Sequence, residues 1–216
     1  MTALVTRHDS EGLAILTLNR PEKLNALTVG MFRELRIHVC DLKVDDSIGC
    51  VVLRGAGKCF SAGHDLADIA EGEDVPAPGW HSETLRLMEK LPQPVIAAVH
   101  GHCYTGALEV ALAADFILAA DNARFGDTHA KWALAPIWGM SQRLPRRVGI
   151  ATAKKLMFTA QMINAEEALR ICIAEDIFPE DDFVASVERI AREIFANSPF
   201  PHTANKRLLE ATDARD

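Results

Sequence analysis

Residues 94–115 read PVIAAVHGHCYTGALEVALAAD. The apolar run behind Pro94 is typical of a buried strand, and the small apolar residues that follow Gly106 are numerous enough for a buried helix. Gly101 and Gly106, at the junction, allow a sharp bend and the close approach of another molecule. The free N–H groups of the first helical turn favour developing negative charge, and Glu109 lies three residues further on. The stretch therefore predicts either an acid/base site beside an oxyanion hole, or a core strand and helix whose single glutamate reaches the surface.

The composition limits the classes of protein to consider. The chain has 216 residues, of which 49% are hydrophobic and 25% charged, as expected for one soluble globular domain. A net charge of −7 without a lysine or arginine cluster gives no support to nucleic-acid binding. The longest apolar run, over residues 107–120, contains two acidic residues and is too short to cross a membrane. Five cysteines without a Cys-x-x-Cys pair favour free thiols and a cytoplasmic location.

Hydrophobic periodicity predicts an α/β core followed by helices. Strands over 4–7 and 13–18 form a predicted hairpin, Thr28 caps a helix, and further buried strands span 48–53 and 116–119. A helix is expected over 80–91, behind the loop-like residues 71–79, which are either a mobile segment over a pocket or a plain surface loop. From Ile150 the pattern is helical, apart from 171–178. We therefore divide the chain into a core, residues 1–150, and a helical region, residues 151–216.

Four motifs, in this order and spacing, resemble the enoyl-CoA hydratase/isomerase (crotonase) superfamily. They are NRPEKLNAL at 19–27, VVLRG at 51–55 with FSAGHDL at 60–66, the stretch 94–115, and QRLPR at 142–146. The resemblance covers nearly the whole chain. It implies an α/β spiral of ββα units that binds acyl-CoA and ends in a helical trimerisation region, hence a homotrimer or a dimer of trimers. The helical region is shorter here than is usual in the family.

The resemblance also implies the site residues. The N–H groups of His64 and Gly106 would hold the thioester carbonyl oxygen, and Glu109 would be the acid/base. Coenzyme A, as part of the substrate and not as a separate cofactor, would contact Lys23, Leu24, Ala26, Ala62, His64, Asp65, Leu66 and Gly106. Lys23 is either a phosphate partner or a solvated loop lysine. No metal is expected, because His100 and His102, which share a strand face, have no third ligand of matching pattern.

Two residues depart from the hydratase pattern. Hydratases of this family position one water with two glutamates, and His129 stands where the second is expected. His129 is either a proton-transfer group or an inert part of the pocket wall, and Asp127 is interpreted as a turn or capping residue rather than a group that orients it. His64 replaces the alanine that is usual in hydratases. Relatives with Ala-Gly-His-Asp at this place include acyl-CoA decarboxylases.

The sequence therefore predicts hydration of 2-enoyl-CoA, in fatty-acid or related acyl-CoA metabolism. The alternatives are another reaction of the superfamily, decarboxylation or isomerisation of an acyl-CoA through Glu109 or His129, and a non-catalytic acyl-CoA binding protein. Among the remaining candidates, His81 is predicted to lie on a helix surface and Cys103 to be a small buried hydrophobe. Trp132 and Trp138 either line an acyl pocket or pack in the core.

Overall fold

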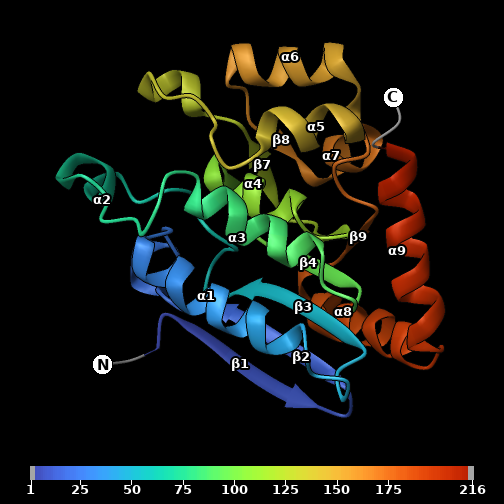
Figure 1. Ribbon diagram of the computed structural model, residues 1–216. Coiled ribbons are helices and arrows are strands. Elements are labelled where there is room, and N and C mark those ends of the chain that lie inside the picture. Colours follow the sequence, from blue (N-terminus) through green and yellow to red (C-terminus); the bar gives the residue numbers. More distant parts are fainter. Residues whose placement is uncertain (1–2, 214–216) are drawn as a thin grey trace.

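The computed structural model, drawn in Figure 1, describes residues 3–213. Its main sheet has six strands. Their order is β1-β2-β3-β4-β6-β9. β1 is antiparallel to β2, and every later neighbour pairs in parallel. The strands are β1 (Val5–Ser10), β2 (Leu13–Leu18), β3 (Cys50–Gly55), β4 (Val95–Val99), β6 (Phe116–Ala120) and β9 (Asp176–Phe178).

A smaller sheet lies beside the main one. It contains β5 (His102–Tyr104), β7 (Arg124–Gly126) and β8 (Ile163–Asn164), in that order. The chain passes from β4 to β5 through Gly101, whose φ is 54° and whose absent Cβ would lie 2.4 Å from the Lys58 carbonyl oxygen. Only glycine fits this turn, because a side chain would meet both strain and a backbone clash. The turn delivers the chain to the start of α4 (Gly106–Leu112), where every residue is buried.

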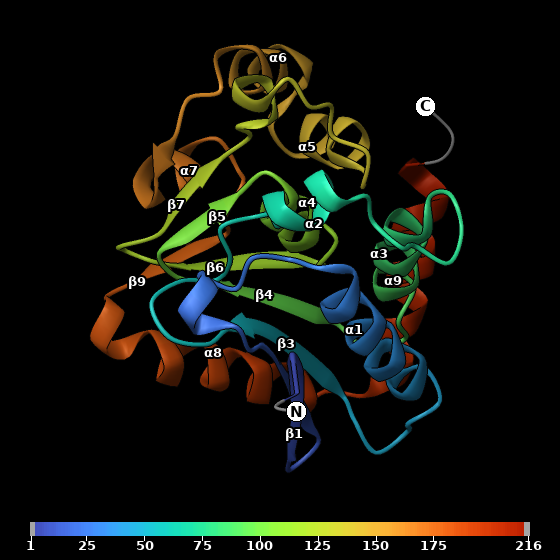
Figure 2. The same cartoon turned by 90° about the vertical axis from the view of Figure 1, so that its left-hand side faces the viewer.

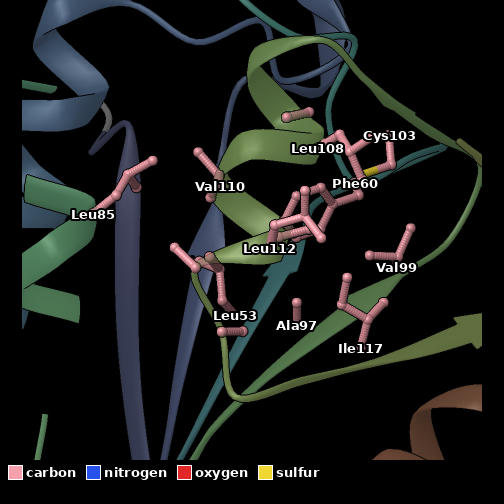
Figure 3. Close-up of a cluster of buried hydrophobic side chains, with 14 of the residues drawn as sticks. Leu53, Phe60, Leu85, Ala97, Val99, Cys103, Leu108, Val110, Leu112 and Ile117 are labelled. Carbon is pink, nitrogen blue, oxygen red and sulfur yellow. The ribbon is translucent and has the colours of Figure 1, made fainter. Parts of the chain in front are cut away.

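Helices cover both faces of the main sheet, as Figure 2 shows. Alternate residues of the parallel strands point to opposite sides, so the strands contribute to two cores. Leu53, Ala97 and Ile117 pack with α1 (Val29–Leu42), α3 (Trp80–Glu89) and α4 in the larger core, part of which is drawn in Figure 3. On the other face Val52 and Ala98 pack, with other residues of these strands, against α8 (Glu180–Phe195).

The remaining elements frame these layers. They are the 3₁₀ turns η1 (Pro21–Lys23) and η2 (His129–Trp132), and the helices α2 (Leu66–Glu71), α5 (Met140–Val148), α6 (Ile150–Thr159), α7 (Ala165–Arg170) and α9 (Pro199–Asp213). α9 is fixed to the core by Lys206, whose Nζ contacts Asp115 at 2.7 Å and donates to the Gln93 carbonyl at 3.1 Å.

Most predicted elements are confirmed. The Thr28 hydroxyl accepts a hydrogen bond from the Met31 N–H at the start of α1, and the helix after the central strand begins at Gly106. The prediction of helix alone after Ile150, outside 171–178, was wrong at β8. That strand has two residues and is held by pairing with β7, which no local periodicity reports. β9, within 171–178, completes the main sheet, so the region after residue 150 supplies strands as well as helices.

Candidate active site

Glu109 is a buried carboxyl group held in one orientation. It lies in the first turn of α4 and is 1% exposed. Its Oε1 accepts hydrogen bonds from the backbone N–H groups of Trp138, at 2.8 Å, and Met140, at 2.9 Å. Burial raises the pKa of Glu109, although these hydrogen bonds and the neighbouring His129 oppose the shift. The side chain therefore turns inward. The alternative prediction, a core helix whose single glutamate reaches the surface, was wrong.

His129 faces Glu109 across a short gap. Its Nε2 lies 3.8 Å from Glu109 Oε2, and its ring is buried. Its Nδ1 is 2.5 Å from Asp127 Oδ1, which also accepts from the His129 backbone N–H at 3.2 Å. Because a carboxylate accepts the proton of Nδ1–H, the neutral imidazole presents the Nε2 lone pair toward Glu109. Asp127 was predicted to be a turn or capping residue rather than a group that orients His129. The capping contact is confirmed, and the same oxygen also contacts the ring, which the prediction did not include.

Two backbone N–H groups lie in the segments that lead into α4 and pack beside it. Gly106 begins α4, so its N–H has no acceptor within the helix. Among residues 3–213, neither this N–H nor that of His64 donates a hydrogen bond to the protein. The 60–66 loop runs parallel to β5 through the bridge between Ser61 and Cys103. At Gly63, with φ 105°, a Cβ would lie 2.2 Å from Thr105 Oγ1, so the absence of a side chain is what lets the two donor segments approach.

The two loops predicted to bind coenzyme A lie side by side. The Ala62 N–H donates to the Leu24 carbonyl at 2.9 Å. Arg20 joins the loops as well, since its Nη1 contacts both Asp65 Oδ2, at 2.9 Å, and the Ala26 carbonyl, at 2.7 Å. The other predicted contacts differ in exposure: Lys23, Leu24 and Leu66 are exposed, and Ala26, Ala62, His64 and Asp65 are partly buried. The structure thus brings the predicted contacts together, and their binding role stays a prediction.

A group of side chains around His64, which we call the histidine–tryptophan cluster, was missed by the sequence analysis. It consists of His64, Glu73, His81 and Trp138. Glu73 Oε1 is 2.5 Å from His64 Nε2 and 3.8 Å from His81 Nε2. The Trp138 ring packs against both imidazoles, with centroids 4.5 Å from His64 and 4.8 Å from His81. The cluster connects the exposed loop after α2 with the residue that carries one of the free donors.

The prediction that His81 lies on a helix surface was wrong, because it is only 5% exposed. Burial lowers its pKa, against the opposite influence of Glu73. A signal was present: His81, Thr84, Leu85 and Met88 have the i, i+3, i+4, i+7 spacing of one buried helix face. Trp138 is buried as core packing predicts, whereas Trp132 is 57% exposed.

Cys103 is confirmed as a buried thiol, and burial raises its pKa well above the ordinary value. Burial likewise raises the pKa of Cys50 to about 12. Because the thiolate is the reactive form, we expect iodoacetamide to label only the exposed Cys40 and Cys172 quickly at pH 8. Peptide mass spectrometry should find Cys50, Cys59 and Cys103 labelled only after denaturation. Rapid native labelling of Cys103 would contradict the inert assignment.

Two features are absent from residues 3–213. None of these helices is both long and apolar enough to span a bilayer. Within the same residues, no group of three or more His, Cys, Asp or Glu side chains is arranged to hold a metal ion.

Comparison with known proteins identifies the family and the fold. A family model described as enoyl-CoA hydratase/isomerase matches residues 8–215. A short-chain-enoyl-CoA hydratase of Clostridium acetobutylicum is 35% identical, over 93% of this chain and 79% of its own. A crotonyl-CoA hydratase of Syntrophomonas wolfei is 36% identical, over 86% and 73%. The crystal structure of an enoyl-CoA hydratase from Bacillus anthracis superposes with a TM-score of 0.94 at 30% identity, covering 99% of this chain and 84% of that one. The chain belongs to the enoyl-CoA hydratase/isomerase family and has its fold.

Proposed function

We propose that this protein adds water to the double bond of a 2-enoyl-CoA, with Glu109 and His129 as the acid/base pair. The observation that carries the proposal is the pair itself, with Glu109 Oε2 and His129 Nε2 facing each other at 3.8 Å. Polar atoms at this separation are too far apart for a good direct hydrogen bond and near enough for one water to contact both. The family membership and the hydratase names of the relatives support the same reaction.

The proton balance of the reaction assigns a role to each group. The water oxygen bonds to the β-carbon of the substrate, and one of its protons passes to Glu109 Oε2 or His129 Nε2. An enolate forms on the thioester, and the α-carbon then takes up a proton from the pair. Asp127 is a positioning residue, because its contact with Nδ1 keeps Nε2 available for this transfer. Histidine thus supplies the second proton-transfer group that a glutamate supplies in the family pattern.

The enolate oxygen needs donors that are already in place. The N–H groups of His64 and Gly106 have no acceptor within residues 3–213, and both belong to segments held close by the Gly63–Thr105 approach. Preorganised donors of this kind act most strongly where water is excluded; loss of one typically costs about 3–4 kcal/mol of transition-state stabilisation. Coenzyme A would lie along the Leu24–Ala62 contact, as part of the substrate, and no separate cofactor enters the reaction.

The Asp127–His129 contact favours an enzyme over a non-catalytic acyl-CoA binding protein. Asp127 and His129 are both buried, and burying two polar side chains is costly unless they are paired. Their pairing leaves Nε2 directed at a second titratable group, which is the arrangement needed for proton transfer and is not required for binding alone.

The experiment follows loss of enoyl absorbance with crotonyl-CoA and with a longer 2-enoyl-CoA, for the wild type and His129→Glu. We expect hydration by both proteins, since either residue can transfer a proton. Binding of butyryl-CoA, measured by calorimetry, is the control for an intact site. An inactive wild type whose His129→Glu variant gains hydration would show that the reaction has been diverted, and release of CO₂ from a malonyl-type thioester would then identify decarboxylation. Tight binding without turnover of any thioester would show a binding protein.

We propose further that the chain acts as a homotrimer, or a dimer of trimers, in the cytoplasm, within fatty-acid or related acyl-CoA metabolism. Support for self-association comes from exposed apolar side chains on η2 and α6, two elements in contact: Trp132 is 57%, Ile150 65% and Phe158 76% exposed. Such patches are typical of interfaces. Support for a reducing compartment comes from five free cysteines. Light scattering coupled to gel filtration measures the oligomeric mass, and a monomer at micromolar concentration would contradict the assembly.

A further inference from the structure

We propose that the histidine–tryptophan cluster is a carboxylate-binding subsite, so that the preferred substrate is a short acyl-CoA with a free carboxylate on its acyl chain. The inference rests on the proposed function, because it specifies the substrate class of the same site. Glu73 of the protein itself lies where that carboxylate would bind.

Two imidazoles already converge on one carboxylate. Glu73 Oε1 is 2.5 Å from His64 Nε2, a hydrogen-bonding distance, and 3.8 Å from His81 Nε2. His64 and Glu73 are largely shielded from solvent, with side chains 14% and 18% exposed, so the contact is not an incidental surface pair. Hydrogen bonds to a charged group in such surroundings are stronger than neutral ones. The histidine–tryptophan cluster therefore already holds one anionic oxygen, that of Glu73.

Glu73 leaves two polar atoms of the histidine–tryptophan cluster without a hydrogen-bond partner among the described residues. His81 Nε2 is buried, faces Glu73 Oε1, and has no hydrogen-bond partner among the described residues. Trp138 Nε1, on the ring that packs against both imidazoles, is likewise buried without an acceptor there. Indole N–H is a donor only, and an unsatisfied buried donor is unfavourable. Glu73 Oε1 stops 3.8 Å from His81 Nε2, whereas a ligand carboxylate that is not tethered to residues 72–79 can approach this nitrogen to hydrogen-bonding distance.

Glu73 is attached in a way that allows replacement. It belongs to residues 72–79, between α2 and α3, where most side chains are exposed. Gly72 and Gly79, with φ of 80° and 71°, lie at the two ends of this segment, and within the described part of the chain no atom beyond their sequence neighbours lies within 4 Å of the position a Cβ would occupy. Withdrawal of Glu73 therefore meets no close packing at these two glycines, whereas His81 is held by the core, where it is 5% exposed.

The position of the histidine–tryptophan cluster next to the thioester site determines the length of the acyl chain. His64 supplies both a backbone N–H for the thioester oxygen and the imidazole that holds the carboxylate. The two groups belong to one residue, so the carboxylate must lie only a few bonds from the thioester. This geometry selects a short dicarboxylic acyl group rather than a long aliphatic chain.

The test compares two saturated, unreactive thioesters of similar shape by calorimetry: glutaryl-CoA and 5-methylhexanoyl-CoA, whose isopropyl end replaces the carboxylate. We expect the wild type to bind glutaryl-CoA at least tenfold more tightly. His81→Phe, which keeps an aromatic ring against Phe32 and Trp138, should lower this ratio to less than threefold. Glu73→Gln should raise the affinity for glutaryl-CoA severalfold, because the competing carboxylate is gone and the exposed loop tolerates the change.

Asp74→Asn is the matched control, since it removes the same charge from the next residue, whose side chain is fully exposed and contacts Arg33. We expect it to leave the ratio of affinities as in the wild type. Equal binding of the two thioesters by the wild type, or preference for the neutral one, would overturn the inference and leave the hydratase proposal standing. Failure to bind either thioester would overturn the proposed function and the inference with it. If His81→Phe does not fold, the wild-type ratio and the Glu73→Gln affinity decide the matter.

Discussion

Replacing Glu109 by glutamine is expected to lower kcat for crotonyl-CoA hydration about 10³-fold, within the range of roughly 10²–10⁴ for loss of a general acid/base. Glutamine keeps an oxygen for the Trp138 and Met140 N–H groups, so the backbone around the site stays in place. It replaces Oε2 by an amide nitrogen, which cannot accept a proton from water. Steady-state rates at saturating substrate measure the loss, and butyryl-CoA affinity within about threefold of wild type shows that the pocket is intact.

The same substitution is expected to leave the protein at least as stable at pH 7. Burial raises the pKa of Glu109 in the folded state. Between the unfolded and the folded pKa, the folded state therefore binds more protons, and stability falls as the pH rises through this window. Glutamine carries no such charge. Urea unfolding at pH 5 and pH 7 should show a smaller loss of stability with rising pH in the variant. A variant that loses both activity and several kcal/mol of stability would show instead that Glu109 is structural.

Asp127→Asn is expected to lower kcat about 10²-fold, with little change in the affinity for butyryl-CoA. Asparagine presents either an oxygen or an NH₂ group to His129, and the NH₂ group favours the tautomer in which Nδ1 accepts and Nε2 carries the proton. That tautomer cannot take a proton from water at Nε2. The loss should appear in kcat rather than in binding, because the change affects which ring nitrogen of His129 carries the proton and leaves the loops predicted to contact coenzyme A unchanged.

An effect on binding alone would contradict the positioning role of Asp127. The control is thermal unfolding of Asp127→Asn, since the residue also caps the turn through the His129 N–H. A large drop in melting temperature with a kcat near that of the wild type would assign Asp127 to the turn only, as the sequence analysis predicted. A lower kcat in a protein that unfolds near the wild-type temperature supports its role toward the ring.

The sequence was sufficient for features that depend on local pattern. The central strand, the helix start at Gly106 and the cap at Thr28 each follow from a short apolar period or a capping residue. The sequence did not predict whether the Glu109 side chain points inward or outward, because its two N–H partners come from residues 138 and 140, about thirty positions away. His81 was predicted on the wrong face, although its spacing with Thr84 and Leu85 was visible, because histidine alone does not indicate burial.

Other contacts could not be predicted from local pattern at all. The path of residues 72–79 determines that Glu73 meets His64, and a loop of exposed polar residues carries no periodicity to fix that path. The two-residue strand β8 depends wholly on β7. Asp127 was a different case: it lies two residues before His129, and the error was to treat a cap and a ring contact as exclusive when one oxygen makes both.

Because Gly63 packs closely against Thr105, substitutions of side chains in the site and substitutions of Gly63 itself have different consequences. The proposed oxyanion hole would consist of the main-chain N–H groups of residues 64 and 106, so side-chain substitutions at residues 64, 109 and 129 would alter the proposed reactive groups and leave these N–H groups in place. A new reaction then requires only a few side-chain replacements, while the backbone of the 60–66 loop and of the start of α4 stays unchanged. A mutation at Gly63, by contrast, disturbs every reaction that this backbone supports.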